Sequence, residues 1–269
     1  MQQYNKVFSE DLAKKIQQTE KETGVLYLSN DGVLPLTSSK VGGIGYFPKD
    51  DTYPIGGSGK PLSLLAQLNF AELTTIDAYP TEGILAFYVD EHDDLLGANF
   101  DDAKDQTGYQ VYYFEDITKP SLSREELSSF PTPEYKIASG EYGITCVKKQ
   151  RPLLAENYEF EQHYGQEFYD FFEAIYGDDI DDKLDAAFEL LMAGAGNGQI
   201  GGYPLFTQTD PRLHEKDLQS DILLFQLDST YHDGIEVMWG DMGIGNFFIH
   251  PDDLKNKQFH KTWYNWDCH

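Results

Sequence analysis

The sequence has few basic residues. Its 269 positions hold 20 lysines and arginines against 46 aspartates and glutamates, so the formal net charge is −26. A field of that sign repels the phosphates of nucleic acids and the headgroups of anionic lipids. We therefore expect no nucleic-acid or membrane partner, and a basic protein becomes a candidate partner. The alternative interpretation is an acidic surface that only keeps the protein soluble.

Cysteines and long apolar runs are scarce as well. Two cysteines, Cys146 and Cys268, are too few for a disulfide framework. No apolar run approaches the roughly 20 residues that span a bilayer. The first ten residues are polar and contain no apolar stretch of the kind found in signal peptides. These features predict a cytoplasmic protein.

Aromatic residues, in contrast, are abundant, with 18 tyrosines, 17 phenylalanines and 3 tryptophans. Such side chains fit pleated, half-buried surfaces and favour strands. One helix is expected over residues 8–23, because Ser9 can cap it and Gly24 can end it. The expected strands are residues 25–28, 64–70, 84–89, 110–114, 144–147, 222–227 and 246–249.

A segment in the middle of the chain has a different pattern. Aromatic residues recur at helical spacing between residues 156 and 177, where Gly177 breaks the pattern. A second helix is expected from about residue 179 to residue 193, and a glycine-rich stretch follows it. This helical pair is interpreted as a connector over about residues 153–196.

The chain also resembles itself on either side of that connector. Gly43 precedes Gln67 by 24 positions, and Gly202 precedes Gln226 by the same 24 positions. Residues 83–89 match residues 243–249 in their glycine and aromatic positions. A fixed spacing of this kind indicates an internal repeat. The predicted fold is α+β, with mainly antiparallel strands in two repeated halves, about 25–150 and 199–269, inside one domain over residues 1–269.

These repeated segments carry a family resemblance. In chain order they are Lys40-Val41-Gly42-Gly43, residues 64–69, 83–89 and 97–102, and Trp239-Gly240-Asp241. Together they resemble the YwqG-like family of uncharacterised bacterial proteins, over about residues 25–259. The resemblance implies an α+β fold and a bacterial cytoplasmic source, and it supplies no activity and no catalytic residues. Tyr53-Pro54 departs from the Trp-Pro that relatives often have, which leaves the fold expectation intact.

Two acidic clusters follow the matched aromatic strands, one in each half. Carboxylate clusters suit Ca²⁺ or Mg²⁺, and an added histidine suits Zn²⁺ or Mn²⁺. The alternative is that these side chains shape turns or face solvent. The candidate metal ligands are Asp90, His92, Asp93 and Asp94 in the first cluster, and His250, Asp252 and Asp253 in the second.

A second candidate site is a ligand seam between the halves. Gln67 and Gln226 stand at matched positions in apolar strands, where a buried amide needs hydrogen-bond partners. Trp239 and Asp241 could add an aromatic platform and a carboxylate. The alternative is that the glutamines bond to the backbone and that Trp239 is a core residue.

The sequence therefore leaves two functions open. No serine or cysteine nucleophile stands in a recognisable motif, which favours a non-enzymatic binding or protein-interaction role for an acidic surface. No cofactor is expected in that case. The alternative is a divalent-metal-dependent hydrolase, or a metal-binding protein, that uses the two acidic clusters.

Overall fold

A computed structural model describes residues 4, 7–74, 76–153, 157–177, 186 and 196–269. Within these residues the chain forms mainly strands, which build one ten-stranded antiparallel sheet and a separate two-stranded hairpin. The helices are α1 (Glu10–Gln18), α2 (Arg124–Ser128), α3 (Glu159–Tyr164), α4 (Phe168–Tyr176) and α6 (Pro251–Lys255). The strands are β1 (Lys21–Ser29), β2 (Lys40–Gly42), β3 (Ser63–Asn69), β4 (Ile84–Val89), β5 (Tyr109–Phe114), β6 (Glu141–Arg151), β7 (Gly198–Gly201), β8 (Ile222–Asp228), β9 (Thr230–His232), β10 (Ile235–Val237), β11 (Ile244–Ile249) and β12 (Trp263–Asp267).

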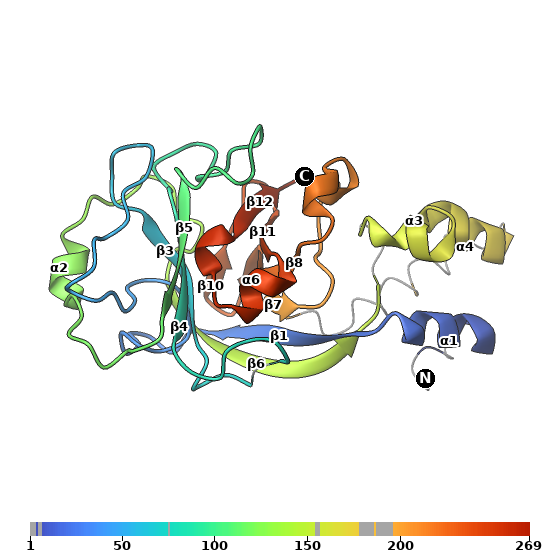
Figure 1. Ribbon diagram of the computed structural model, residues 1–269, viewed down its shortest axis with the longest axis horizontal. Coiled ribbons are helices and arrows are strands. Elements are labelled where there is room, and N and C mark those ends of the chain that lie inside the picture. The colour runs from blue at the N-terminus through green and yellow to red at the C-terminus, as the bar shows by residue number, and fades with distance from the viewer. Residues whose placement is uncertain (1–3, 5–6, 75, 154–156, 178–185, 187–195) are drawn as a thin grey trace.

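The expected α+β fold is therefore wrong, because strands predominate and helices are few within the described residues. The large sheet dominates the molecule, and it bends so strongly that its two ends face each other and nearly meet (Figure 1). Helices α1, α3 and α4 gather beyond one end of the sheet, and α2 lies at the opposite end. The abundance of aromatic residues explains this result, because they serve the two faces of the sheet rather than helix packing.

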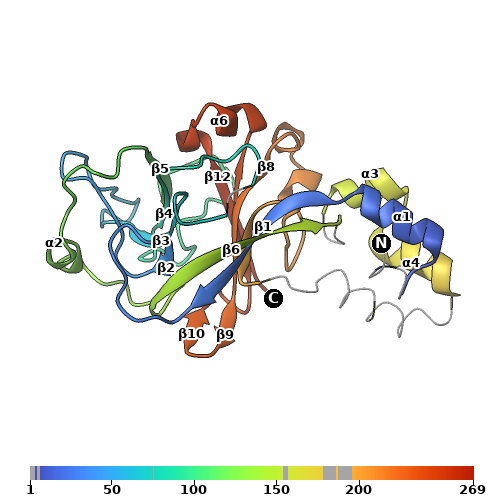
Figure 2. The same ribbon diagram turned by 90° about the horizontal axis from the view of Figure 1, so that it is seen from below.

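The two halves of the sheet have the same strand order. The sheet runs β12-β11-β8-β7-β1-β6-β2-β3-β4-β5, so four strands of each half flank a central pair, β1 and β6 (Figure 2). Strand β1 comes directly before β2 in the chain, but its partner outside the central pair is β7. Strand β6 comes directly before β7 in the sequence of strands, but its partner outside the central pair is β2. Both central strands thus come from the first 153 residues, and the second half borders β1.

The pairing register is also the same in the two halves. Gln67 on β3 lies opposite Lys40, and Gln226 on β8 lies opposite Gln199. Both outer pairs, β3–β4 and β8–β11, contain a bulge at the matched position. As a result, position n in β2 and β3 corresponds to position n + 159 in β7 and β8.

The main core fills the space enclosed by the bent sheet. Phe87 stacks on Phe225 with ring centroids 4.5 Å apart and contacts Phe247 at 4.8 Å. Tyr109 on β5 contacts Tyr264 on β12 at 5.3 Å, so the two edge strands approach each other. Buried aromatic rings from both halves therefore hold the two ends of the sheet together.

Helices were placed less accurately than strands. The expected helix over residues 8–23 ends earlier, at Gln18, because Lys21 already enters β1 and pairs with Arg151. The expected helix over residues 156–177 is two helices, α3 and α4, since Gly165 ends the first in a left-handed conformation. The expected helix over residues 179–193 lies outside the described residues.

Candidate functional site

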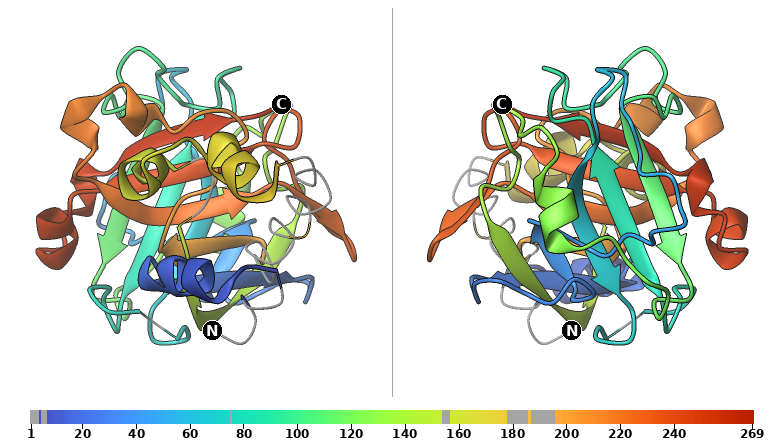
Figure 3. Two further views of the ribbon diagram at one scale, coloured as in Figure 1. Left: turned by 90° about the vertical axis from the view of Figure 1, so that its right-hand side faces the viewer. Right: turned by 90° about the vertical axis from the view of Figure 1, so that its left-hand side faces the viewer.

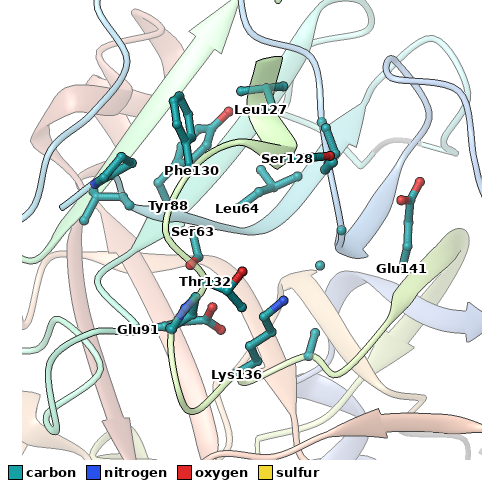
Figure 4. Close-up of a pocket in the computed structure, with 18 of the residues that line it drawn as sticks. Ser63, Leu64, Tyr88, Glu91, Leu127, Ser128, Phe130, Thr132, Lys136 and Glu141 are labelled. Carbon is teal, nitrogen blue, oxygen red and sulfur yellow. The ribbon is translucent and has the colours of Figure 1, made fainter. Parts of the chain in front are cut away.

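A cavity of about 380 Å³ lies on the outer face of the first half. Its lining comes from β2, β3 and β4 and from the segment between α2 and the start of β6. In the right-hand view of Figure 3, α2 lies in front of the sheet. Figure 4 shows that polar and apolar side chains from these separate segments point into the same space. The cavity is assembled from four stretches of chain that are far apart in the sequence.

One wall of the cavity is apolar and aromatic. Leu64 and Tyr88 are buried on the neighbouring strands β3 and β4. The Tyr53 ring contacts Tyr88 at 5.7 Å and Phe130 at 4.8 Å between ring centroids. Burial among these rings raises the pKa of the Tyr53 phenol. This wall can cover the apolar part of a bound molecule.

The glycine pair seen in the sequence forms the edge of the cavity. Gly42 and Gly43 both have positive φ angles, 66° and 67°. A Cβ atom at Gly42 would lie 2.4 Å from the carbonyl oxygen of Gly140 on the neighbouring segment. Glycine is therefore required here both by the backbone conformation and by the close approach. Gly42 and Gly43 line the cavity together with Ile44 and Gly45, which follow in the same turn.

Glu141 occupies one end of the cavity and is fully engaged with cations. Its carboxylate accepts a hydrogen bond of 2.9 Å from the Lys40 ammonium and bonds of 2.8 and 3.2 Å from the Arg124 guanidinium. The backbone N–H of Leu34 adds a fourth bond, of 3.0 Å. These donors outweigh burial and hold the pKa of Glu141 at about 2. Glu141 is a structural carboxylate and stays ionised.

Glu91 stands at the opposite end, and its side chain is buried. One of its oxygens, Oε1, accepts a hydrogen bond of 2.7 Å from the backbone N–H of Ile137. Burial raises the pKa of this carboxyl, while the bonds from Ile137 and Ser63 and the charge of Lys136 act in the opposite direction. Glu91 therefore anchors the covering segment and presents a polar group to the cavity.

Lys136 is the second cation of the cavity lining, and its side chain is exposed. Its side chain points toward the middle of the space, beside Thr132 (Figure 4). Its ammonium makes no hydrogen bond or ion pair with any residue that the structure describes. The Lys40 ammonium differs, because its three donors go to Glu141 and to the carbonyl oxygens of Pro35 and Ile44. The ammonium of Lys136 can therefore still donate hydrogen bonds to a bound molecule.

The corresponding place in the second half is more filled. There a cavity of about 180 Å³ is lined by Gly201 and Gly202, which match Gly42 and Gly43. Tyr203 stands where the first half has Ile44, and Ile222 stands where it has Ser63. Tyr203 also lines a separate cavity of about 470 Å³ together with residues of α1 and α3. The cavity bordered by the glycine pair itself is nevertheless smaller in the second half than in the first.

The first acidic cluster shapes a turn and does not enter the cavity as a unit. The Asp90 carboxylate accepts hydrogen bonds from the N–H and hydroxyl of Ser58 and from the N–H of His92. The His92 Nδ1 atom lies 3.4 Å from the Lys60 ammonium. Asp93 and Asp94 follow in the same turn, and Asp94 is exposed.

The second acidic cluster begins α6. The Nδ1 atom of His250 accepts a hydrogen bond from the N–H of Asp252, which caps this short helix. Asp253 pairs with the Lys261 ammonium at 2.7 Å, and the side chain of Asp252 is exposed. In the parts of the chain that the structure describes, no group of three or more His, Cys, Asp or Glu side chains is arranged to hold a metal ion.

The two seam glutamines have the same role in the two halves. The side-chain oxygen of Gln67 accepts the N–H of Tyr46, and that of Gln226 accepts the N–H of Leu205, which is the matched residue. The Gln67 amide nitrogen donates to the carbonyl oxygens of Leu36 and Ser38. The Gln226 amide nitrogen donates to Asp228 at 2.6 Å. Both glutamines therefore hold neighbouring segments against their strands.

The other two seam candidates lie apart from these glutamines. Trp239 is fully buried in the main core, where it stacks near Trp266 at 6.2 Å. Asp241 is exposed, and its backbone oxygen accepts the N–H of His269. Neither residue lines the 380 Å³ cavity.

The sequence did not reveal the residues that carry this cavity. Glu91 lies within the first acidic cluster but was not among the candidates named there. Lys136 and Glu141 have no local pattern that marks them. The available signal was the glycine pair together with Pro131-Thr132-Pro133, because both segments border the cavity.

Comparison with known proteins places most of the chain in one family model. The model is described as a domain of unknown function (DUF1963), and it matches residues 39–268. No curated protein matches the chain. None of the described helices has the length and apolar character needed to cross a membrane.

Proposed function

The chain belongs to the DUF1963 family, whose function is unknown, and from this premise we propose that it is a non-enzymatic binding protein with its ligand site in the cavity between β2–β4 and residues 124–141. The cavity presents a free ammonium, a buried carboxyl and an apolar wall within one space. Concave sites that combine an apolar lining with a few polar groups are the usual binding places for small molecules.

The observation that carries this proposal is the difference between the two halves. Both halves have the same strand order and register, so the sheet itself does not require a cavity of about 380 Å³ at this place. In the second half Tyr203 and Ile222 occupy positions that Ile44 and Ser63 hold in the first. An open polar cavity that the fold does not need is best explained by a ligand.

The residues around the cavity favour binding over catalysis. Neither histidine nor cysteine is among its described lining residues, so the hydroxyls of Ser63 and Thr132 have no imidazole base beside them. The acidic exterior supports a second role, the binding of a basic protein, because charge complementarity accelerates such encounters. The divalent-metal-dependent hydrolase, or a metal-binding protein, remains the alternative proposal for the two acidic clusters.

We also propose a narrower placement for the protein. Apart from residues 25–38, the stretch that resembles the YwqG-like family lies within the matched range 39–268, which supports that finer assignment. A bacterial cytoplasmic location is consistent with the two cysteines, both of which are free thiols.

The test fills the cavity with the side chains of the other half. The variant Ser63→Ile with Ile44→Tyr copies residues that the same framework already accommodates, so we expect a melting temperature equal to or above that of the parent. A fragment library screened by saturation-transfer NMR should give fewer hits with the filled variant. His214→Ile is the control, since it adds an apolar side chain at an exposed position outside the cavity. Equal hit lists for all three proteins would refute the proposed site.

A further inference from the structure

The charged groups around the cavity are not equally engaged. Two cationic side chains, Arg124 and Lys136, and two carboxyls, Glu91 and Glu141, line the cavity, while the buried Lys40 ammonium binds Glu141 from outside the lining. Glu141 is bound by both Lys40 and Arg124, and Glu91 accepts the N–H of Ile137. The other ionisable groups in the lining are the phenols of Tyr53 and Tyr88, which carry no charge at neutral pH. Among these described lining groups, Lys136 is therefore the charged group that no hydrogen bond holds in place, and its charge acts on Glu91.

The two cations of the lining differ in how firmly they are held. The Arg124 guanidinium already donates to both oxygens of Glu141 and to the carbonyl oxygen of Leu34, so it is held in place. The Lys136 ammonium has all of its donors available within the described part of the chain, and it points into the space (Figure 4). One free ammonium matches one negative charge, which suits a carboxylate better than a doubly charged phosphate.

The other lining residues indicate which chemical groups the rest of the ligand should carry. Leu64, Tyr88 and Phe130 form an apolar wall next to the ammonium, and Glu91 and Thr132 add polar groups beside it. A cationic ligand would place its charge against Lys136. A fully polar ion would leave the aromatic wall without a partner. The surroundings thus fit a molecule with one carboxylate and an apolar body.

We infer that the ligand of the cavity is a small organic acid whose carboxylate pairs with Lys136 and whose apolar part packs on Leu64, Tyr88 and Phe130. This inference rests on the binding function proposed above. A charge-assisted hydrogen bond in a partly enclosed site is strong enough to select a carboxylate over its neutral counterpart by about tenfold or more.

The experiment compares three probes that share one ring and differ in charge: phenylacetate, phenylacetamide and phenethylamine. Binding to the full chain is followed by two-dimensional ¹⁵N NMR, using the amide signals of Gly43, Ser63 and Thr132. We expect phenylacetate to move these signals at a concentration about tenfold lower than the other two probes. Lys136→Met should remove this preference and Lys136→Arg should retain it. Lys119→Met, a change at an exposed lysine outside the cavity, should leave it unaltered.

The possible failures are distinguishable. If phenethylamine or the amide binds as tightly as phenylacetate, or if Lys136→Met keeps the preference, the ligand class is wrong while the cavity remains a binding site. If no probe and no fragment from the library moves the cavity signals, both the inference and the proposed function are refuted. The fold of each variant is checked by its melting curve and by the amide signals of β8 and β11, which contribute no residue to the cavity lining.

Discussion

Replacing Glu141 by glutamine tests the ion pair that borders the cavity. The side chain of Lys40 is fully buried and that of Glu141 is 12% exposed, so the pair is largely removed from water. The substitution keeps the size of the side chain but leaves the Lys40 ammonium with two carbonyl partners and without its hydrogen-bonded carboxylate. Breaking a buried pair by removal of one member costs roughly 3–5 kcal/mol.

The pKa of Glu141 gives an independent magnitude. A fall from an ordinary value of 4.5 to about 2 corresponds to about 3 kcal/mol of stability at neutral pH. Because the folded-state pKa is lowered, this contribution is present above pH 4.5 and is lost as the pH falls toward 2. Burial lowers the pKa of Lys40, and the loss of Glu141 lowers it further, so the ammonium can release its proton in the variant. We therefore expect a loss near the lower end, about 3 kcal/mol.

Urea unfolding followed by tryptophan fluorescence measures this effect, with Trp239, Trp263 and Trp266 as reporters. The second half offers a matched rescue, because Gln199 and Thr23 occupy the positions of Lys40 and Glu141. The double variant Lys40→Gln with Glu141→Thr should recover much of the loss. A single variant within 1 kcal/mol of the parent at pH 7, or a difference that does not shrink between pH 5 and pH 3, would refute the reasoning.

Three further predictions concern other polar groups of the sheet. Gln67→Leu should cost about 1–3 kcal/mol in urea unfolding, because it leaves the N–H of a buried neighbour unpaired, and an unchanged midpoint would exclude a structural role for the glutamine. Asp228→Asn introduces the residue that Asn69 provides in the first half. Because burial raises the pKa of Asp228 to about 6, the free energy of unfolding of the variant should increase relative to that of the parent as the pH rises from 4 to 7. A difference that does not depend on pH would contradict this. Asp93→Asn with Asp253→Asn should weaken capture of a basic protein without moving the melting temperature. If the double substitution instead abolishes an increase in melting temperature caused by Mn²⁺ or Zn²⁺, the result supports the metal proposal. If neither the capture of the basic protein nor the metal-dependent melting temperature changes, both proposals for these clusters fail.

Strands that contain continuous apolar runs could be predicted from the sequence because that pattern is local. It located β3, β4, β8 and β11 to within one or two residues. The longest strands, β1 and β6, were predicted over four residues each. Strands β2, β7, β9, β10 and β12 were missed, since strands of three to five residues carry little periodicity. The balance of the fold was misjudged because the aromatic residues of a short helical segment look like a large helical layer when their partners are unknown.

The cavity could not be predicted in the same way, because no local pattern records which distant segments will meet. Lys136 becomes notable only when Ile137 is seen to bond with Glu91, which lies in another part of the chain. The glycine pair was recognised as a special turn, but its effect depends on the approach of Gly140. Residue types could be read from the sequence, whereas their convergence depends on the tertiary structure.

The pairing of β1 with β7 affects the order in which the sheet can form during synthesis. Residue 23 on β1 pairs with residue 201 on β7, so the second half cannot complete its hydrogen bonds until the first strand is already in place. A ribosome delivers β1 early and β7 late, and the edge of β1 must wait for most of the chain to emerge. The first 153 residues contain β1 to β6 and can form a continuous sheet, whereas residues 196–269 lack a border strand of their own. During synthesis the second half therefore depends on the first for its border strand, although the two halves have the same strand order in the finished sheet.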